Sequence, residues 1–105
     1  MLEKKMLEKQ IEERGCSYAK DKGITAYKFT SPNRTAVPDR LQLAVIPEEL
    51  RELIGKYVCF VEYKREGEKP TPAQLREHHR LREMGFRVEV VDNVDLAKSV
   101  IDSMG

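Results

Sequence analysis

An apolar stretch of strand type, Tyr57–Lys64 (YVCFVEYK), ends in two opposite charges. Side chains alternate along an extended strand, so Glu62 and Lys64 point to the same face, about 7 Å apart along the chain. A second stretch that favours a strand begins upstream at Pro38-Asp39. A buried charge is costly unless it is paired or bound to a metal. Three charged groups directed onto an otherwise apolar face therefore indicate a functional site.

The chemistry of this set is that of phosphodiester cleavage. We predict that the strands starting at Asp39 and ending near Glu62 pair antiparallel, which brings both carboxylates to one sheet edge. Two carboxylates are what Mg²⁺ typically takes from a protein, with the Tyr63 carbonyl as a further ligand, and Mn²⁺ is expected to substitute. The ion would activate a water for inverting attack, while Lys64 would offset the charge that builds on the phosphate. The short pattern Pro-Asp … Glu-x-Lys alone often occurs by chance.

The composition bounds the partners of the chain. Its 105 residues fit a single domain, residues 1–105, and its net charge of +1 means that DNA affinity must come from local patches. Residues 1–10 are charged throughout and no apolar run could span a bilayer, so we expect a soluble, cytoplasmic protein without a membrane partner. Cys16 and Cys59 lack metal-ligand spacing and are expected to be reduced thiols. The candidate phosphate contacts are Lys28, Arg65, Lys69 and Arg76.

The elements that must position these residues follow from periodicity and from turn signals. The pattern predicts the α/β class, with a mixed four-stranded sheet flanked by helices in the order α-β-β-(short α)-β-α-β-α. The expected helices span residues 2–22, 47–54, 72–84 and 93–103, and the expected strands span 25–30, 39–45, 57–65 and 86–91.

Four blocks of the chain, in order, strongly resemble the virus-type replication-repair nuclease (VRR-NUC) domain, a branch of the PD-(D/E)xK superfamily. The blocks are Ser31-Pro32 with Val37–Leu41, then Phe60–Lys64, then Lys69–His78, then Gly85–Val88. The resemblance spans about residues 11–94. It implies a restriction-endonuclease-like core, metal-dependent hydrolysis and DNA as the substrate. The small stand-alone members of this family, mostly phage and bacterial, are homodimers that cut branched DNA such as Holliday junctions. The resemblance therefore implies a homodimer, a branched DNA substrate and a bacterial host cell.

The resemblance also implies a helix glutamate and a glutamine in the site. Spacing to Gly23 in the family pattern selects Glu12 as a metal ligand, whereas helix geometry alone would slightly favour Glu8, which we keep as the reserve. Gln74 matches the family glutamine and is expected to assist catalysis. It also has a structural explanation, because Thr71 and Gln74 form a capping box around a helix start.

Other features carry less chemistry. His78 shares a helix stripe with apolar residues and is expected to pack with one satisfied nitrogen, while His79 is expected at the surface. Where the family often has glycine, this chain has Ala36, which indicates that no positive φ is needed there. The segment Pro47–Gly55 is longer than the usual family turn and could serve as a lid, a dimer contact or a spacer.

The sequence thus favours a small Mg²⁺-dependent DNA endonuclease that resolves Holliday junctions as a homodimer. One alternative keeps the site but changes the substrate geometry to nicks, flaps or ends. Another, of a different class, is a catalytically silent DNA-binding module. RNA as the substrate is excluded by no residue.

Overall fold

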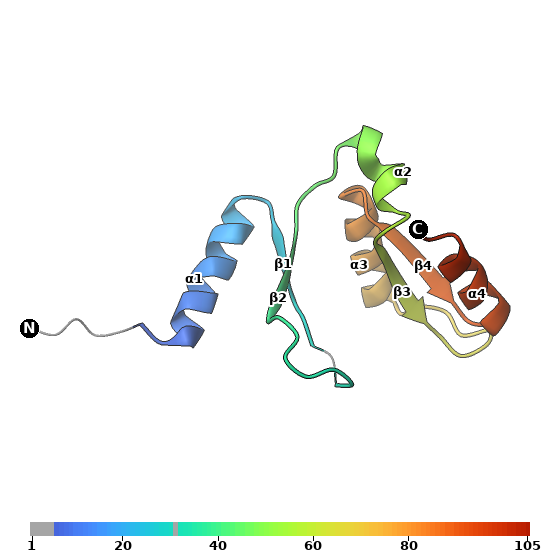
Figure 1. Ribbon diagram of the computed structural model, residues 1–105, viewed down its shortest axis with the longest axis horizontal. Helices are drawn as coiled ribbons and strands as arrows, with labels where there is room; N and C mark the ends of the chain where they lie inside the picture. The colour runs from blue at the N-terminus through green and yellow to red at the C-terminus, as the bar shows by residue number, and fades with distance from the viewer. Residues whose placement is uncertain (1–5, 31) are drawn as a thin grey trace, which may run out of the picture. The chain divides into compact units, whose positions relative to one another are not determined.

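The computed structural model describes residues 6–30 and 32–105 of the chain, which form two compact units, residues up to Val45 and Ile46–Gly105 (Figure 1). Each unit has its own two-stranded sheet. None of the described helices is long and apolar enough to cross a bilayer. The α/β class is therefore confirmed for each unit, while the expected single domain and the expected four-stranded sheet stay predictions.

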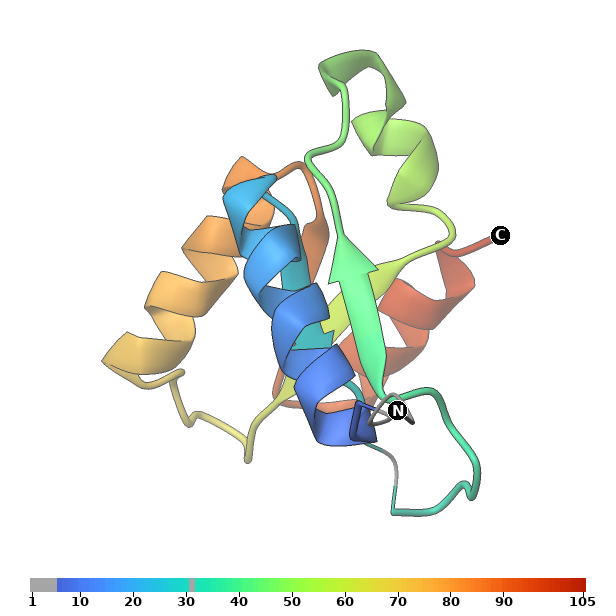
Figure 2. The same ribbon diagram turned by 90° about the vertical axis from the view of Figure 1, so that its left-hand side faces the viewer.

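The first unit is a helix on a β-hairpin. Helix α1 (Glu8–Asp21) packs against strand β1 (Thr25–Lys28), which pairs antiparallel with β2 (Arg40–Leu43) (Figures 1 and 2). The register places Lys28 opposite Arg40, and the backbone N–H of Phe29 donates to the carbonyl of Asp39 (2.8 Å), one step beyond the strands. Residues 2–5 of the expected helix, and Ser31 of the expected loop, lie outside the described residues.

One expectation about this hairpin is wrong. Ala36 has a φ of +62°, in the left-handed region, although alanine at this position predicted an ordinary backbone. The loop must bring Asp39 back beside Phe29 within a few residues, and Ala36 lies in one of the turns of this loop. A lone methyl group does not prevent this conformation, although it makes the backbone less favourable than glycine would.

The second unit is a parallel strand pair with helices on both sides. Strand β3 (Cys59–Tyr63) pairs in parallel with β4 (Arg87–Val91), and the connecting helix α3 (Pro72–Glu83) packs on β4. Helix α4 (Val94–Asp102) packs on the opposite side of β4 (Figures 1 and 2). The expected short helix is present as η1 (Glu48–Leu50) and α2 (Arg51–Ile54).

Apolar burial concentrates in this second unit. Side chains from α3 and its C-cap, from β4 and α4, and from the first residue of the unit are less than one-tenth exposed: Ile46, Leu81, Met84, Val88, Val91 and Val100. Gly85 ends α3 with a φ of +98°, and a Cβ there would lie 2.5 Å from the Arg51 side chain. A glycine is therefore required both by the backbone conformation and by the close approach of α2.

Candidate active site

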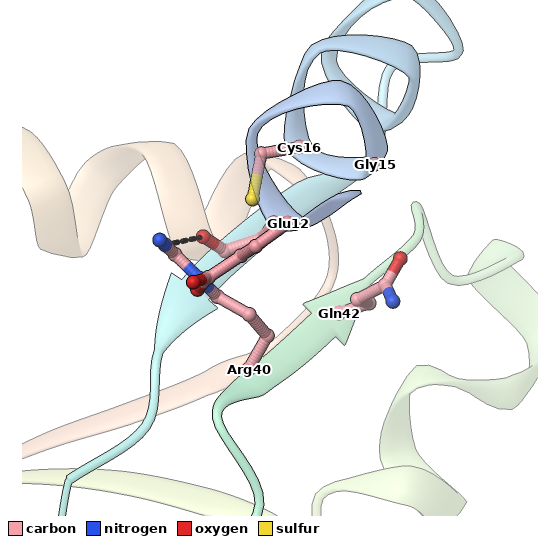
Figure 3. A pocket seen from close by; sticks show the side chains of 6 residues that line it. Glu12, Gly15, Cys16, Arg40 and Gln42 are labelled. Carbon is pink, nitrogen blue, oxygen red and sulfur yellow. Dashed lines mark hydrogen bonds and ion pairs between the residues drawn. The ribbon is translucent and has the colours of Figure 1, made fainter. Parts of the chain in front are cut away.

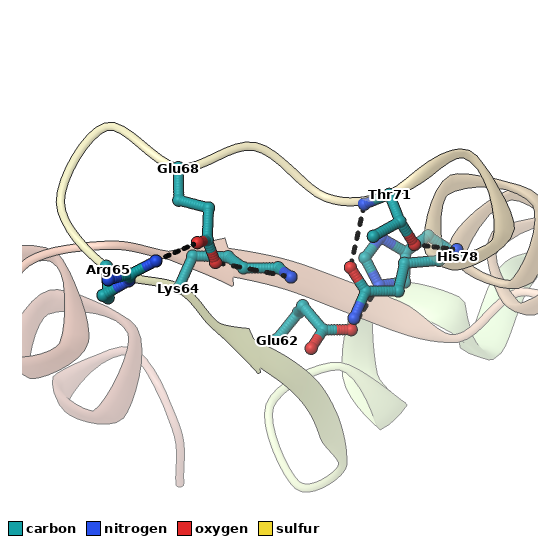
Figure 4. Close-up of polar contacts among 7 residues, drawn as sticks. Glu62, Lys64, Arg65, Glu68, Thr71 and His78 are labelled. Atoms are coloured by element: carbon teal, nitrogen blue, oxygen red, sulfur yellow. Dashed lines mark hydrogen bonds and ion pairs between the residues drawn. The ribbon is translucent and has the colours of Figure 1, made fainter.

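The C-terminal end of β3 carries the first part of the site. Glu62 lies opposite Val90 in the ladder, and the backbone N–H of Lys64 donates to the carbonyl of Val91 (2.8 Å), so the ladder continues through Lys64. Both side chains rise from the same side of the strand (Figure 4). The Lys64 side chain is only 11% exposed, whereas Tyr63 between them is 62% exposed. The alternation of β3 therefore turns both charges toward one partly buried face.

Glu62 has a buried histidine as its partner. Nε2 of His78 lies 3.1 Å from Oε1 of Glu62, and His78 is 5% exposed. The prediction that His78 packs with one satisfied nitrogen is confirmed, since Nδ1 has no hydrogen-bond partner among the described residues. That the partner is Glu62 was missed. No local pattern signals this contact, because it joins a helix residue to a strand residue 16 positions away.

Lys64 is held by the loop that follows it. Its Nζ lies 3.7 Å from Oε1 of Glu68, and Arg65 pairs with the other carboxylate oxygen of Glu68 at 3.3 Å (Figure 4). The loop is fixed further by the backbone N–H of Gly67, which donates to Oδ2 of Asp92 (3.1 Å). This hydrogen bond, with a second one from Asn93, lowers the pKa of Asp92. The ammonium group of Lys64 thus sits beside a single carboxylate at a distance longer than a hydrogen bond.

The start of α3 confirms the expected capping box. The backbone N–H of Gln74 donates to Oγ1 of Thr71 (3.1 Å), and the backbone N–H of Thr71 donates to Oε1 of Gln74 (2.9 Å). Pro72 follows as the first helical residue, where its missing N–H costs nothing. The cap uses only the oxygen of the Gln74 amide, so its NH₂ group can still donate to another acceptor.

In the first unit, Glu12 contacts the strand that follows the Pro-Asp motif. Nε of Arg40 donates to Oε2 of Glu12 (2.6 Å), and Nη1 donates to the carbonyl of Ala26 (3.3 Å). The hydrogen bond to Glu12 raises the pKa of Arg40 above its ordinary value. Figure 3 shows the pair at the wall of a cavity of about 120 Å³, which Cys16 and Gln42 also line. Sequence reasoning missed Arg40, because an ion pair between a helix and a distant strand leaves no local pattern.

Asp39 and Glu8 are placed differently from Glu12. Asp39 is exposed and directly precedes β2, and its carboxylate makes no hydrogen bond or ion pair within residues 6–30 and 32–105. Glu8 is exposed in the first turn of α1. The Arg40 contact brings Glu12 to the residue beside Asp39, and no such contact is found for Glu8 in the described part of the chain.

The two sets belong to different units, Glu12 with Asp39 and Glu62 with Lys64. Among the described side chains, no three His, Cys, Asp or Glu groups gather closely enough to hold a metal ion. The joint carboxylate set is thus still a prediction. The expected phosphate contacts are all exposed: Lys28, Arg65, Lys69 and Arg76. His79 is exposed, as expected, and pairs with Glu83 at 3.4 Å.

Comparison with known proteins identifies a relative that spans most of the chain. No family model matches. "Putative nuclease p44" of Acyrthosiphon pisum secondary endosymbiont phage 1 is 48% identical over 90 residues, which cover 86% of this chain and 87% of the relative. A solved structure described as a VRR_NUC domain is 29% identical, with 90% of this chain and 94% of that chain covered and a TM-score of 0.41. At this identity and coverage, the chain and the phage relative are members of one family.

Proposed function

The chain belongs to the same family as this phage relative, and from that membership, with the resemblance of its sequence to the virus-type replication-repair nuclease (VRR-NUC) domain, we propose that it is a divalent-metal-dependent DNA endonuclease. Its substrate would be branched DNA, and its activity the resolution of Holliday junctions by a homodimer. The observation that carries the proposal is the pair Glu62 and Lys64 on one partly buried face at the end of β3. In such a pair, the carboxylate would bind a cation, and the ammonium group would face the phosphate that the cation polarises.

The proposed metal ligands are the carboxylates of Asp39, Glu62 and Glu12, with the carbonyl of Tyr63. The donor chemistry fits Mg²⁺ or Mn²⁺, because all are hard oxygen ligands and Glu62 has one oxygen outside the His78 contact. We propose that β2 pairs antiparallel with β3 in a four-stranded sheet, which would join Asp39 to Glu62. This pairing rests on the family resemblance. When bound, the ion would supply Lewis acidity and a water of lowered pKa.

The remaining work belongs to the protein side chains. Lys64 offsets the negative charge that develops on the phosphate, and its weak hold on Glu68 (3.7 Å) lets the ammonium group turn to the substrate. Gln74 donates its NH₂ group, which the helix cap does not use, to a phosphate oxygen while its oxygen keeps the cap. Lys28, Arg65, Lys69 and Arg76 contact neighbouring backbone phosphates, which positions the duplex without reading its sequence.

The homodimer is proposed from the geometry of the substrate. A small domain covers only part of a four-way junction, and two copies related by a two-fold axis present two sites to two symmetric strands. Exposed apolar side chains on α1 and at its N-cap offer a surface that a second copy would cover: Ile11 and Tyr18 on the helix, and Leu7 before it. Sedimentation that shows a monomer at tens of micromolar protein would contradict the dimer but not the chemistry.

The deciding experiment is cleavage of a labelled four-way junction in Mg²⁺, Mn²⁺ and Ca²⁺. The wild-type protein is compared with Asp39→Asn, Lys64→Ala and, as a matched control, Lys98→Ala, which removes an exposed lysine from α4. Paired symmetric nicks with Mg²⁺ or Mn²⁺, lost in the first two variants and kept in the third, are the expected result.

Other outcomes select the alternatives. Cutting of nicked, flap or linear DNA in place of the junction would keep the site and replace the substrate, and preference for RNA would do the same. Tight DNA binding without cleavage in any of the three metals would refute the proposed enzymatic activity and favour a DNA-binding module.

A further inference from the structure

His78 is the one polar or charged residue that is less than one-tenth exposed among the described residues. It lies in the middle of α3, between Leu75 and Leu81 on the helix, and Leu81 is itself buried. A leucine at this position would continue the apolar face. Burial of an imidazole here, with Nδ1 unsatisfied in residues 6–30 and 32–105, is therefore unfavourable for stability and needs a compensating role.

The contact with Glu62 fixes where the imidazole proton must be. A carboxylate oxygen only accepts hydrogen bonds, so the 3.1 Å contact requires a proton on Nε2 of His78. The reverse tautomer would set two lone pairs against each other and leave a buried N–H at Nδ1 without an acceptor. The donor therefore faces one defined oxygen of Glu62, Oε1. Since α3 is anchored at Thr71 and by its buried face, the donor itself is rigidly held.

We propose that His78 is a positioning residue for the metal site, an inference that rests on the proposed function. By occupying Oε1, it leaves Oε2 as the oxygen of Glu62 that binds the cation, so that Glu62 acts as a one-oxygen ligand. Mg²⁺ and Mn²⁺ accept such ligands in compact octahedral sites, whereas Ca²⁺ is larger and more often takes both oxygens of a carboxylate. His78 thereby favours the small cations over Ca²⁺.

Three variants separate this role from simple core packing. His78→Gln keeps an N–H donor near the position of Nε2, His78→Leu keeps the bulk without the donor, and His79→Leu is the matched control on the exposed side of α3. Binding of Mn²⁺ and of Ca²⁺ alone is measured calorimetrically on each full-length protein. Thermal melting is recorded alongside, because His78→Leu also removes the unsatisfied Nδ1 and is expected to move the melting temperature by less than about 5 °C.

The expected result is a loss of Mn²⁺ affinity of about tenfold or more in His78→Leu, with Ca²⁺ affinity unchanged or raised. His78→Gln recovers most of the Mn²⁺ affinity, and His79→Leu equals wild type. NMR of the imidazole nitrogens in the metal-free protein shows the proton of His78 on Nε2. Equal Mn²⁺ affinity in wild type and His78→Leu, failure of glutamine to rescue, or a proton on Nδ1 alone would each overturn the inference.

The failure of the inference is distinguishable from the failure of the proposed function. A wild-type protein that cleaves DNA and binds Mn²⁺, with His78→Leu indistinguishable from it, refutes the positioning role alone. A wild-type protein that neither binds Mn²⁺ nor cleaves any of the DNA substrates refutes both.

Discussion

The two units of the chain hold their site residues in different ways. In the second unit, Glu62 and Lys64 extend from a strand whose ladder is complete, and their partners His78 and Glu68 come from α3 and from a tethered loop. In the first unit, Asp39 is exposed at the end of a loop, and Arg40 is the one side-chain partner of Glu12 among the described residues. Of the apolar side chains buried in the described structure, only Ala19 and Leu43 belong to the first unit.

The two units differ in how much apolar surface they bury, although both carry residues of the proposed site. A unit that buries little apolar surface has little free energy to hold its side chains in one arrangement. The second unit can therefore hold the Glu62 carboxylate in one place before substrate arrives, whereas Asp39 of the first unit, a further proposed ligand, is exposed. The four predictions that follow test whether the units are equal in catalysis and unequal in stability.

The largest effect is expected on catalysis, from matched substitutions in the two units. Glu62→Gln and Glu12→Gln should each lower the rate of DNA cleavage by about 10²-fold or more, because each removes a charge that the proposed cation requires. Single-turnover cleavage of the labelled junction measures both. Glu8→Gln is the control and should cleave at the wild-type rate. If Glu8→Gln fails and Glu12→Gln does not, the reserve residue is the ligand.

The next effect is on stability and should differ between the units. Leu81→Ala, at a position 4% exposed in the second unit, should lower the free energy of unfolding by about 3 kcal/mol through lost burial and a cavity. Ile11→Ala, at a position 57% exposed in the first unit, should change the free energy of unfolding of the monomer by less than about 0.5 kcal/mol, at protein concentrations too low for a dimer. Urea denaturation measures both, and Leu75→Ala, 52% exposed on α3, is the control within one helix. Comparable losses of unfolding free energy in Leu81→Ala and Ile11→Ala would contradict the predicted difference between the two units.

A smaller gain is expected from the hairpin loop of the first unit. Ala36→Gly should raise the free energy of unfolding by about 1 kcal/mol, because glycine adopts the φ of +62° without the Cβ penalty. Gly23→Ala is the opposite test: its φ is +75° and no atom would crowd a new Cβ, so strain alone should destabilise it by about 1 kcal/mol. No change in Ala36→Gly would show that the loop relaxes out of this conformation in solution.

The smallest effect concerns pH and the loop that holds Lys64. The Gly67 N–H lowers the pKa of Asp92 from its ordinary value of 3.8, so Asp92 stabilises the folded state above that value. This stabilisation is lost as the pH falls through the lowered pKa. The melting temperature of wild type should therefore exceed that of Asp92→Asn by a constant amount above about pH 5, and the difference should shrink as the pH falls from the ordinary value through the lowered pKa of Asp92. If the difference in melting temperature between wild type and Asp92→Asn grows on acidification, the Gly67 contact does not stabilise the ionised form of Asp92.

Local signals predicted most of the elements. Thr71, Pro72 and Gln74 specify a helix start by contacts within four residues, and the capping box is found as expected. The strands are shorter than predicted at their ends, because alternation continues into residues that have left the ladder. The same local alternation was enough to place Glu62 and Lys64 on one face.

The missed features depend on residues far apart in sequence. Nothing near His78 or Arg40 reveals that each meets a glutamate, 16 and 28 residues away respectively. The φ of Ala36 was mispredicted because residue type was taken to decide a conformation that closure of the hairpin imposes. Pairing of β2 with β3 is equally non-local, and local pattern could only suggest it.

The alternation of β3 also decides which changes in length the gene can tolerate. One codon inserted between Glu62 and Lys64 would turn the lysine to the opposite face of the strand, although every chemical group would still be encoded. Codons inserted after Arg65, where the chain has left the ladder, would leave Glu62 and Lys64 on the same face of the strand. Homologues should therefore vary in length on one side of Lys64 and be invariant in length on the other, so the spacing of these two residues is inherited as strictly as their identity.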